Sequence, residues 1–393
     1  MIDSHGALES VIRHAVQLDE DYDDIAPAVT ALAASGDTTL VPHLLEALQR
    51  FLDEKNFYGR DLIAAVLAGI DATAALPALL RASATDLGDD QDSLQSEIIE
   101  LLHGDTTAGR GVAREFATAD TPDLRRVGLW ALGFVIDAQD VELLSAAAID
   151  TDATIRSIAI GSIPDPAGND RAFHTLVAAL RDPDEQVRTS AVSRLGYTGR
   201  RDAVAPLIGL VADEAPRVRS MLAYSFGRLG SDEATPTLQR LVHDSDRHVR
   251  ERAVEALGSV GGPAAVDTLL LLAADANPQL RVHAAKALPR AVDSDPRVAP
   301  RLVELARDAQ AAVRAATVSG LASSEAPPSR WENLLVELAD DGDPMVRQRV
   351  AVVVRQLAPA AAQNILHRYT RDTDATLRRV AAAELERLTN SPL

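Results

Sequence analysis

The chain has 393 residues, with 58 acidic and 39 basic side chains and a formal net charge of −19. It contains no cysteine, which excludes disulfides, cysteine-based zinc sites, iron–sulfur clusters and thiol nucleophiles. Hydrophobic residues make up 47% of the chain but aromatic residues only 3%, so the apolar content is mainly aliphatic, which favours helices over a β-sandwich or barrel.

The charged residues predict a protein adapted to salt. Only two of the basic residues are lysine, Lys55 and Lys286, and aspartate outnumbers glutamate 39 to 19. This composition resembles that of proteins from halophilic archaea; the alternative is a GC-rich genome, which favours arginine and alanine codons. The sequence shows no apolar run of about 18 residues and no basic, then apolar, N-terminal stretch. We therefore expect no transmembrane helix, no signal peptide and a cytoplasmic location.

The first 120 residues form a strongly acidic segment, with 22 acidic against 7 basic side chains, whereas residues 121–393 carry 36 against 32. Two acidic stretches, 19–24 and 86–92, are predicted loops. Carboxylates suit calcium and magnesium, but the first stretch lacks the ligand spacing and glycine of an EF-hand, and we interpret it as a solvated loop. Apolar periodicity predicts helices at 40–48, 61–69, 75–80 and 94–102.

From residue 121 an apolar–arginine pair recurs every 31 to 33 residues. The nine arginines are Arg125, Arg156, Arg188, Arg219, Arg250, Arg281, Arg314, Arg347 and Arg378. Numbered from this arginine as zero, apolar or small residues fill positions −1, +3, +4 and +7, which is the period of an amphipathic helix. Asp or Asn at −4 is typical of a helix N-cap, and proline at −3 suits the first helical position. Glycine at +8 falls near the helix end, and Gly230 and Gly261 lie just beyond it, where a left-handed residue ends a helix.

A second helical pattern lies between these helices, at 203–211, 234–242 and 298–306. Each unit is thus a pair of helices, which cannot bury its apolar face alone and must stack on its neighbours. The Ala-x-Pro-x-Leu of the first helix and the Asp-x-x-Val-Arg-x-x-Ala-x-x-x-Leu-Gly around the second resemble the HEAT repeat, in the short form named after phycobilisome lyases. The resemblance implies an all-α, right-handed α-solenoid of about 11–12 HEAT-like helix pairs. We expect it to be regular over 121–393 and degenerate over 1–120.

The repeat arginine is a candidate phosphate ligand that helical geometry argues against. At about 100° per residue the core positions centre at about −35°, so the arginine lies at the edge of the core-facing side, in the first turn of its helix. A partly buried guanidinium needs hydrogen-bonded partners, and the aspartates near the helix starts, in the same or the neighbouring unit, can supply them. The HEAT resemblance implies the same ladder of Asp and Arg. We therefore predict a structural role for this arginine.

The outward face of these second helices, at positions +1, +2, +5 and +9, is the candidate binding surface. In HEAT-like solenoids the second helices line the concave side, so the resemblance implies a groove there. The face holds eight basic residues against three acidic ones, and exposed aromatic residues beside arginine are typical of interface anchors. We predict that the partner-binding residues are Arg126, Trp130, Tyr197, Tyr224, Arg228, Arg252, His283, Lys286, Arg290 and Arg349. The alternative is packing and solvation of the helix ends.

These features predict a non-catalytic scaffold or adaptor that binds an acidic or mixed-charge protein partner. Nucleic acid is the weaker choice of partner, because the face holds a single lysine and no aromatic stacking series, and high salt weakens phosphate contacts. The enzymatic alternative is a lyase-like or metal-assisted activity. His243 and His248 have two aspartates between them, although the same segment is typical of an ordinary turn between helices.

Known catalytic motifs are missing from the sequence. It has no Gly-rich phosphate loop, no Gly-x-Ser-x-Gly elbow and no His-Glu-x-x-His. None of the nine histidines precedes a glutamate, unlike the di-iron His-Glu pairs of the HEAT-repeat deoxyhypusine hydroxylase. Bilin lyase activity would follow only from the name of the repeat, and a fold does not fix a function. We therefore predict no catalytic residue, no metal site, no cofactor and no membrane association, and make no prediction of the oligomeric state.

Overall fold

A computed structural model describes residues 4–17, 22–164, 166–323 and 327–390. The described residues lie in helices and the turns that join them and include no strand. The helices group into two compact units, Met1–Ala191 and Val192–Leu393, which we call unit 1 and unit 2. This boundary falls inside the regular repeats. The predicted division after residue 120 rests on charge and repeat regularity, and it stays a prediction.

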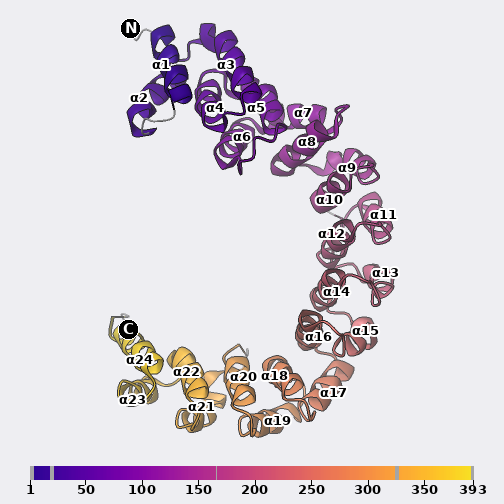
Figure 1. Ribbon diagram of the computed structural model, residues 1–393. Coiled ribbons are helices and arrows are strands. Elements are labelled where there is room, and N and C mark those ends of the chain that lie inside the picture. Colours follow the sequence, from indigo (N-terminus) through magenta and orange to yellow (C-terminus); the bar gives the residue numbers. More distant parts are fainter. Residues whose placement is uncertain (1–3, 18–21, 165, 324–326, 391–393) are drawn as a thin grey trace. The chain divides into compact units, whose positions relative to one another are not determined.

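Unit 1 consists of helix pairs in which an odd-numbered first helix precedes an even-numbered second helix (Figure 1). Its helices are α1 (Ser4–Gln17), α2 (Tyr22–Ala33), α3 (Val41–Asp53), α4 (Phe57–Asp71), α5 (Leu76–Ser83), α6 (Asp92–Gly104), α7 (Thr106–Ala117), α8 (Pro122–Val135), α9 (Val141–Ala147), α10 (Ala153–Ser162), α11 (Asp170–Ala179) and α12 (Glu185–Gly196), whose last residues belong to unit 2.

Unit 2 continues the same order of first and second helices. Its helices are α13 (Val204–Ile208), α14 (Pro216–Leu229), α15 (Thr235–Leu241), α16 (Arg247–Val260), α17 (Pro263–Leu272), α18 (Pro278–Ala287), α19 (Val298–Leu305), α20 (Ala311–Ala322), α21 (Glu332–Leu338), α22 (Pro344–Val353), α23 (Pro359–Tyr369) and α24 (Ala375–Asn390). The described residues thus form twelve successive helix pairs, which confirms the predicted all-α stack.

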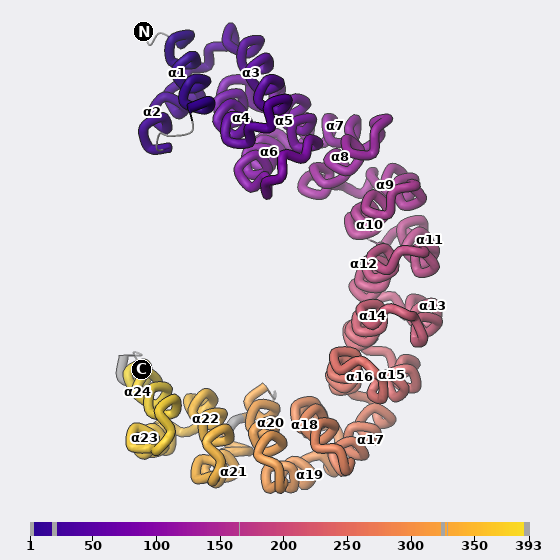
Figure 2. Tube along the Cα trace, in the orientation of Figure 1, coloured from indigo at the N-terminus to yellow at the C-terminus, as the bar shows by residue number. Residues whose placement is uncertain are grey.

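The second helices of unit 2 pack directly on one another. Helix α14 contacts α16, which contacts α18, and these contacts continue through α20 and α22 to α24. Within this unit the second helices follow the inner side of the curve and the first helices its outer side (Figures 1 and 2). The outward positions of successive second helices are therefore neighbours on one face of the unit.

Helix α16 shows how the repeat pattern builds the core. Its residues at −1, +3, +4 and +7 are fully buried, namely Val249, Ala253, Val254 and Leu257. Asp246 caps the helix by accepting the N–H groups of His248 and Val249 at 2.8 and 3.1 Å, and Gly261 ends it with a φ of 70°. Burial of each Val or Leu side chain stabilises the folded chain by roughly 1.5–3 kcal/mol. Stacking of neighbouring repeats therefore stabilises each helix pair.

The glycines Gly227 and Gly258, at position +8, allow neighbouring second helices to approach closely. The sequence pattern predicted only that these glycines lie near the helix end. A Cβ atom on Gly227 would lie 3.1 Å from the Cα of Ala256, and one on Gly258 would lie 3.1 Å from the Cβ of Ala287. These contacts join α14 to α16 and α16 to α18. A side chain at either glycine would crowd the neighbouring helix.

The four helices predicted in the acidic segment are confirmed as α3, α4, α5 and α6. The predicted loop at 86–92 is confirmed as far as Gln91, and α6 begins at Asp92. The predicted loop at 19–24 is wrong in its second half: residues 18–21 lie outside the described residues, and α2 begins at Tyr22. Asp23 and Asp24 stand in its first turn, where the helix dipole favours negative charge.

The stretch Phe57–Ser83 is long and apolar enough to cross a membrane by length and composition, because it contains a window of 18 residues with a mean hydropathy of 1.9. The sequence expectation of no such helix therefore does not hold on these two criteria. The stretch is divided into α4, a short 3-10 turn and α5, with Ala72 between them at a φ of 44°. Helix α4 buries most of its apolar residues and contacts α1, α2, α3 and α6, so in this structure it is a core helix of unit 1.

Candidate functional site

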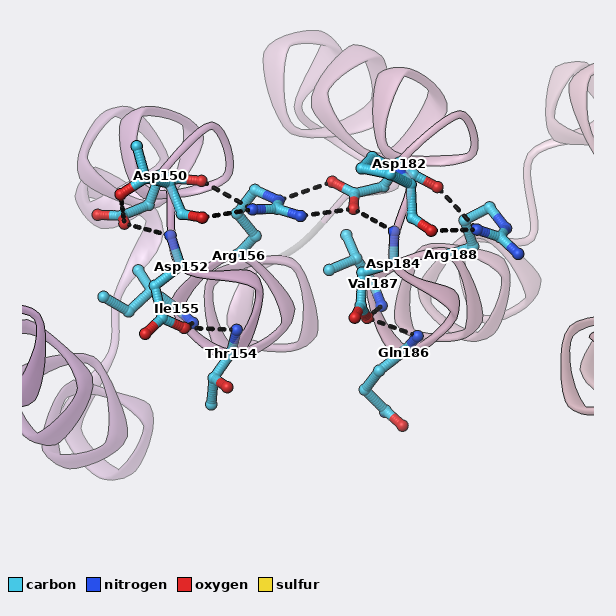
Figure 3. Close-up of polar contacts among 12 residues, drawn as sticks. Asp150, Asp152, Thr154, Ile155, Arg156, Asp182, Asp184, Gln186, Val187 and Arg188 are labelled. Atoms are coloured by element: carbon cyan, nitrogen blue, oxygen red, sulfur yellow. Dashed lines mark hydrogen bonds and ion pairs between the residues drawn. The ribbon is translucent and has the colours of Figure 1, made fainter.

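The repeat arginine is held between two consecutive repeats. Figure 3 shows Arg156 between Asp150 and Asp182. Its Nε and Nη2 donate to the two carboxylate oxygens of Asp182, both at 2.8 Å. Its Nη1 donates to the backbone oxygens of Asp150 and Thr151 at 2.9 and 3.3 Å. Asp182 also accepts the backbone N–H of Asp184 at 2.9 Å, so each rung links one second helix to the turn before the next.

The same rung recurs in both units. The ion pairs are Arg125–Asp150, Arg156–Asp182, Arg219–Asp244, Arg281–Asp308, Arg314–Asp341 and Arg347–Asp372. The predicted structural role is confirmed, but the carboxylate comes from six positions before the next repeat arginine, not from the residue at −4. The residue at −4 caps the helix, as Asp184 does for Gln186 and Val187. These arginines are therefore engaged within the fold.

The rungs also fix the charge of their carboxylates. Hydrogen bonds from the paired guanidinium groups hold the pKa values of Asp244, Asp308, Asp341 and Asp372 below the ordinary value of aspartate. Each of these carboxylates therefore stays ionised to a lower pH in the folded chain than in the unfolded one.

A further rung lies in the degenerate N-terminal part, where no apolar–arginine pair was found. Arg60 on α4 is fully buried, and its Nη1 and Nη2 donate to the carboxylate of Asp89 at 3.0 and 2.6 Å. Asp89 accepts the backbone N–H of Gln91 at 3.1 Å, as in the regular rungs. Gly59 replaces the usual apolar residue, and a Cβ there would lie 2.7 Å from the ring of Phe51. The buried Phe51 ring therefore fills the space of the missing side chain.

One junction in unit 2 has an incomplete rung. Arg250 on α16 donates to the backbone oxygens of Asp244 and Ser245 at 2.7 and 2.8 Å. In the described part of the chain, no ion pair joins it to Asp275, the aspartate at the equivalent position before α18. The α16–α18 junction is thus held without a charged rung.

Two tyrosines and two arginines form a surface cluster on the inner side of unit 2. The hydroxyl groups of Tyr197, just after α12, and Tyr224 on α14 lie 3.0 Å apart. The guanidinium of Arg228 lies 4.3 Å from the ring centroid of Tyr197, and that of Arg252 lies 5.7 Å from that of Tyr224. Tyr197 remains 53% exposed. Four of the predicted binding residues are thus brought together in a stack that is open to solvent.

Three adjoining cavities run along this face, and together we call them the inner groove. The first, of about 660 Å³, is lined by Ser193, Tyr197, Pro216, Arg217, Ser220, Met221, Tyr224, Asp246, His248 and Arg252. The second, of about 430 Å³, is lined by Tyr224, Gly227, Arg228, Arg252, Glu255, Ala256 and Ser259. The third, of about 460 Å³, is lined by Arg247, Glu251, Glu255, His283, Lys286, Ala287, Arg290, Ser319, Gly320 and Ser323. Because neighbouring cavities share lining residues, the groove is continuous from the end of α12 to α20.

The third cavity holds both paired and unpaired charges. Arg247 donates from Nε to Glu251 at 2.7 Å, and the His283 Nε2 lies 3.9 Å from the same carboxylate. Burial lowers the pKa of His283 below the ordinary value, so the imidazole is neutral near pH 7. Lys286 and Arg290 are exposed and form no ion pair with any described residue. The free positive charge of this cavity therefore comes from these two side chains.

Three of the ten predicted residues lie outside the inner groove. Arg349 is exposed on α22 and lines none of the three cavities. Arg126 and Trp130 lie on α8 in unit 1. Arg126 pairs with Asp152 at 3.2 Å, and Trp130 packs edge to face on Phe134 with ring centroids 5.1 Å apart. These contacts fit the packing alternative, and a role of the three residues in binding stays a prediction.

Arg217 and His248 also line the first cavity, but they were not among the residues predicted from the sequence to bind a partner. Both stand at position −2 from a repeat arginine, which corresponds to about 160° around the helix. That angle lies between positions +5 and +9 on the outward face. The helical rule used for the other positions would therefore have included them.

The histidines of the metal-assisted alternative have other surroundings. His248 lies on the exposed face of α16, 3.8 Å from Glu251 on the same helix, and His243 is exposed in the preceding turn. Among the described residues, no group of three or more His, Asp and Glu side chains is placed to hold a metal ion.

The sequence matches the family model of HEAT repeats over residues 173–247, 218–289, 236–322 and 299–386, together more than half of the chain. Among curated proteins, none matches the chain in sequence.

Several solved structures are similar in fold. Kap95p, in its structure with RanGDP, aligns with a TM-score of 0.63 and 15% identity over 98% of this chain and 61% of its own. Kap121p bound to Pho4p aligns with a TM-score of 0.56 and 12% identity over 96% of this chain and 48% of its own. The CpcE–CpcF complex of phycocyanin lyase from Nostoc sp. PCC7120 is 20% identical over 63% of this chain and 94% of its own, but its TM-score of 0.36 carries no argument. Identities this low show the fold alone, a helical solenoid.

Proposed function

Because the chain belongs to the HEAT-repeat family, we propose that it is a non-catalytic scaffold or adaptor whose inner groove binds an acidic or mixed-charge protein partner. Two solenoids of similar fold support this role, since Kap95p was solved with RanGDP and Kap121p with Pho4p. A shared fold does not fix a function, so the proposal rests on the chemistry of the groove itself.

The observation that carries the proposal is the stack of Tyr197, Tyr224, Arg228 and Arg252. Tyrosine and arginine, together with tryptophan, are enriched among the residues that dominate binding energy at protein interfaces. Here each arginine already lies over an aromatic ring, at 4.3 and 5.7 Å from the centroids. A guanidinium held in place loses less conformational entropy when a partner binds. The cluster is thus arranged before any partner arrives.

The charge of the groove supports an acidic partner. Three acidic residues line the groove: Glu251 pairs with Arg247, Glu255 pairs with Arg252, and Asp246 caps α16. Four further basic residues line the groove and form no ion pair in the described part of the chain, namely Arg217, Arg228, Lys286 and Arg290. A positive groove in a chain of net charge −19 favours negatively charged partners and disfavours basic ones.

Charge reversal in the groove tests the proposal. Proteins captured by the unaltered chain are identified, purified and measured again with the triple variant R252E/K286E/R290E. A matched control, R201E/R240E/R371E, changes the net charge equally at exposed positions outside the groove. We expect the groove variant to lose at least about tenfold in affinity and the control to keep the affinity of the unaltered chain. Equal loss or equal retention in the two variants would contradict the proposal.

The same capture experiment distinguishes a protein partner from nucleic acid. Protein binding that survives nuclease treatment supports the scaffold role. Binding that nuclease abolishes, with a steep fall as salt rises, would point to phosphate contacts instead.

We further propose that the acidic surface keeps the chain soluble in concentrated salt, as expected for a cytoplasmic protein of a halophilic archaeon. The proposal is supported by the excess of aspartate over lysine and by the screening of like charges at high ionic strength. A melting temperature that rises between 0.1 and several molar KCl supports it, and a flat or falling profile contradicts it.

A further inference from the structure

We infer that the partner binds the inner groove as an extended acidic peptide segment, with a large apolar side chain in the first cavity and carboxylates at Lys286 and Arg290 in the third. This inference rests on the proposed function and adds the form of the partner and the spacing of its contacts. Three features of the groove carry it.

The first feature is an apolar recess at one end of the groove. Met221 and Tyr224 on α14 line the first cavity together with Tyr197 and Pro216. Tyr197 is 53% exposed and forms an open edge of this cavity. An aromatic or large aliphatic side chain of a partner would bury apolar surface against these groups and so reduce their contact with water.

The second feature is a pair of free cations at the other end. Lys286 lies in the last turn of α18, and Arg290 lies four residues later in the 3-10 turn that follows it. They form no ion pair with the described residues, whereas Arg247 is engaged by Glu251 at 2.7 Å. Glu251 and Glu255 line the same cavity and are paired with Arg247 and Arg252. Lys286 and Arg290 are two separate cations, so each can bind one carboxylate of the partner.

The third feature is the cavity that connects the two ends. Gly227, Ala256 and Ser259 line this second cavity, of about 430 Å³, together with Tyr224, Arg228, Arg252 and Glu255. The three small side chains leave room for a peptide backbone between the larger ones.

The spacing of the two contacts follows from helix packing. Helix α14 contacts α16, and α16 contacts α18. Packed helices lie about 8–10 Å apart, so the two ends of the groove are separated by roughly 16–20 Å. An extended chain covers about 3.3–3.6 Å per residue. The apolar side chain and the acidic pair of the partner should therefore be about five or six residues apart.

Synthetic peptides test this spacing on the full chain by fluorescence anisotropy. Each labelled peptide carries one tryptophan and two aspartates, separated by a Gly-Ser linker of about two, five or nine residues. We expect the five-residue linker to bind at least about tenfold tighter than the other two. Y224A should remove the preference for tryptophan over glycine at the anchor, and K286E/R290E should remove the preference for aspartate over asparagine. The control variant R240E, on the first helix α15, should change neither.

Other results of these measurements would overturn the inference. Affinity that depends on peptide charge but not on linker length would show that no fixed spacing is read. Phosphoserine in place of aspartate that binds at least about tenfold tighter would show that the third cavity prefers phosphate. If a purified protein partner depends on the groove but no peptide binds at any spacing, the peptide inference fails while the proposed function stands. If the partner is insensitive to the groove variants, both fail.

Discussion

At the scale of single residues, the arginine in the first turn of each second helix serves the fold. The six ion-paired arginines of the regular repeats named above each bind a carboxylate of the next repeat and two backbone oxygens of their own, as Arg219 does with Asp244, Asp213 and Glu214. Those two backbone oxygens lie in the turn that precedes the helix. One side chain therefore stabilises a turn, the start of a helix and the junction between two successive repeats.

Replacement of Arg219 by alanine should destabilise unit 2 strongly. Arg219 is 9% exposed, and removal of one partner of a buried ion pair typically costs about 3–5 kcal/mol. Urea unfolding followed by circular dichroism would measure this loss. R240A, at an exposed arginine on α15, should stay within about 0.5 kcal/mol of the unaltered chain. If R219A unfolds at the same urea concentration as R240A, the rungs do not stabilise the stack.

At the scale of elements, the helices were predictable and the contacts between them were not. The apolar period, the Asp or Asn caps and the prolines at the first helical position depend on residues close in sequence. They predicted the second helices of 121–393 and three of the first helices, although the helix expected at 203–211 ends at Ile208. The four helices expected in the acidic segment are confirmed for the same reason. The rung of Arg60 was not predicted because Gly59 stands where the other repeats have an apolar residue. Phe51, on the preceding helix, fills the space of that side chain.

The lining of the inner groove was predictable in part, whereas its role in binding stays a prediction. Seven of the ten predicted residues line the inner groove, because angular position on a helix follows from sequence alone. The cavities themselves depend on the distance between neighbouring second helices and on which cations find a carboxylate. Neither quantity is local, so the sequence did not show that Arg126 pairs with Asp152 while Lys286 stays free.

Gly59 offers a test of the degenerate rung at the scale of α4. G59A would place a Cβ 2.7 Å from the Phe51 ring, and such overpacking typically costs about 1–3 kcal/mol. F51L makes room for the new methyl group, so the double variant F51L/G59A should be less destabilised than the sum of the two single variants. Unfolding free energies of the three variants measure this coupling. A neutral G59A, or strictly additive effects, would show that Phe51 does not fill the space at position 59.

At the scale of the whole molecule, the rungs couple stability to pH. The pKa values of Asp244, Asp308, Asp341 and Asp372 are lowered by hydrogen bonds from their paired arginines. A lowered folded pKa means that the unfolded chain binds protons first as the pH falls. The rungs therefore contribute fully above the ordinary aspartate pKa of about 3.9, and their contribution is lost as the pH falls through that value to the lowered ones.

The expected melting temperature is nearly constant between about pH 7 and 5 and falls steeply below about pH 4. D244N should melt lower at pH 7, because its rung is lost, and should show a smaller further loss on acidification. Differential scanning calorimetry over this range is the measurement. A stability that rises on acidification would contradict the assignment of ionised carboxylates in the rungs.

Two proposals together describe the whole molecule. The arginines in the first turns of the second helices join successive repeats, and the outward face of the second helices in unit 2 binds the partner. A photo-crosslinking amino acid placed at Tyr224 in the inner groove, or at Arg240 on the first helix α15, tests this claim with a purified partner. We expect crosslinks from position 224 and none from position 240. Crosslinks from position 240 alone, with the partner still bound, would contradict it.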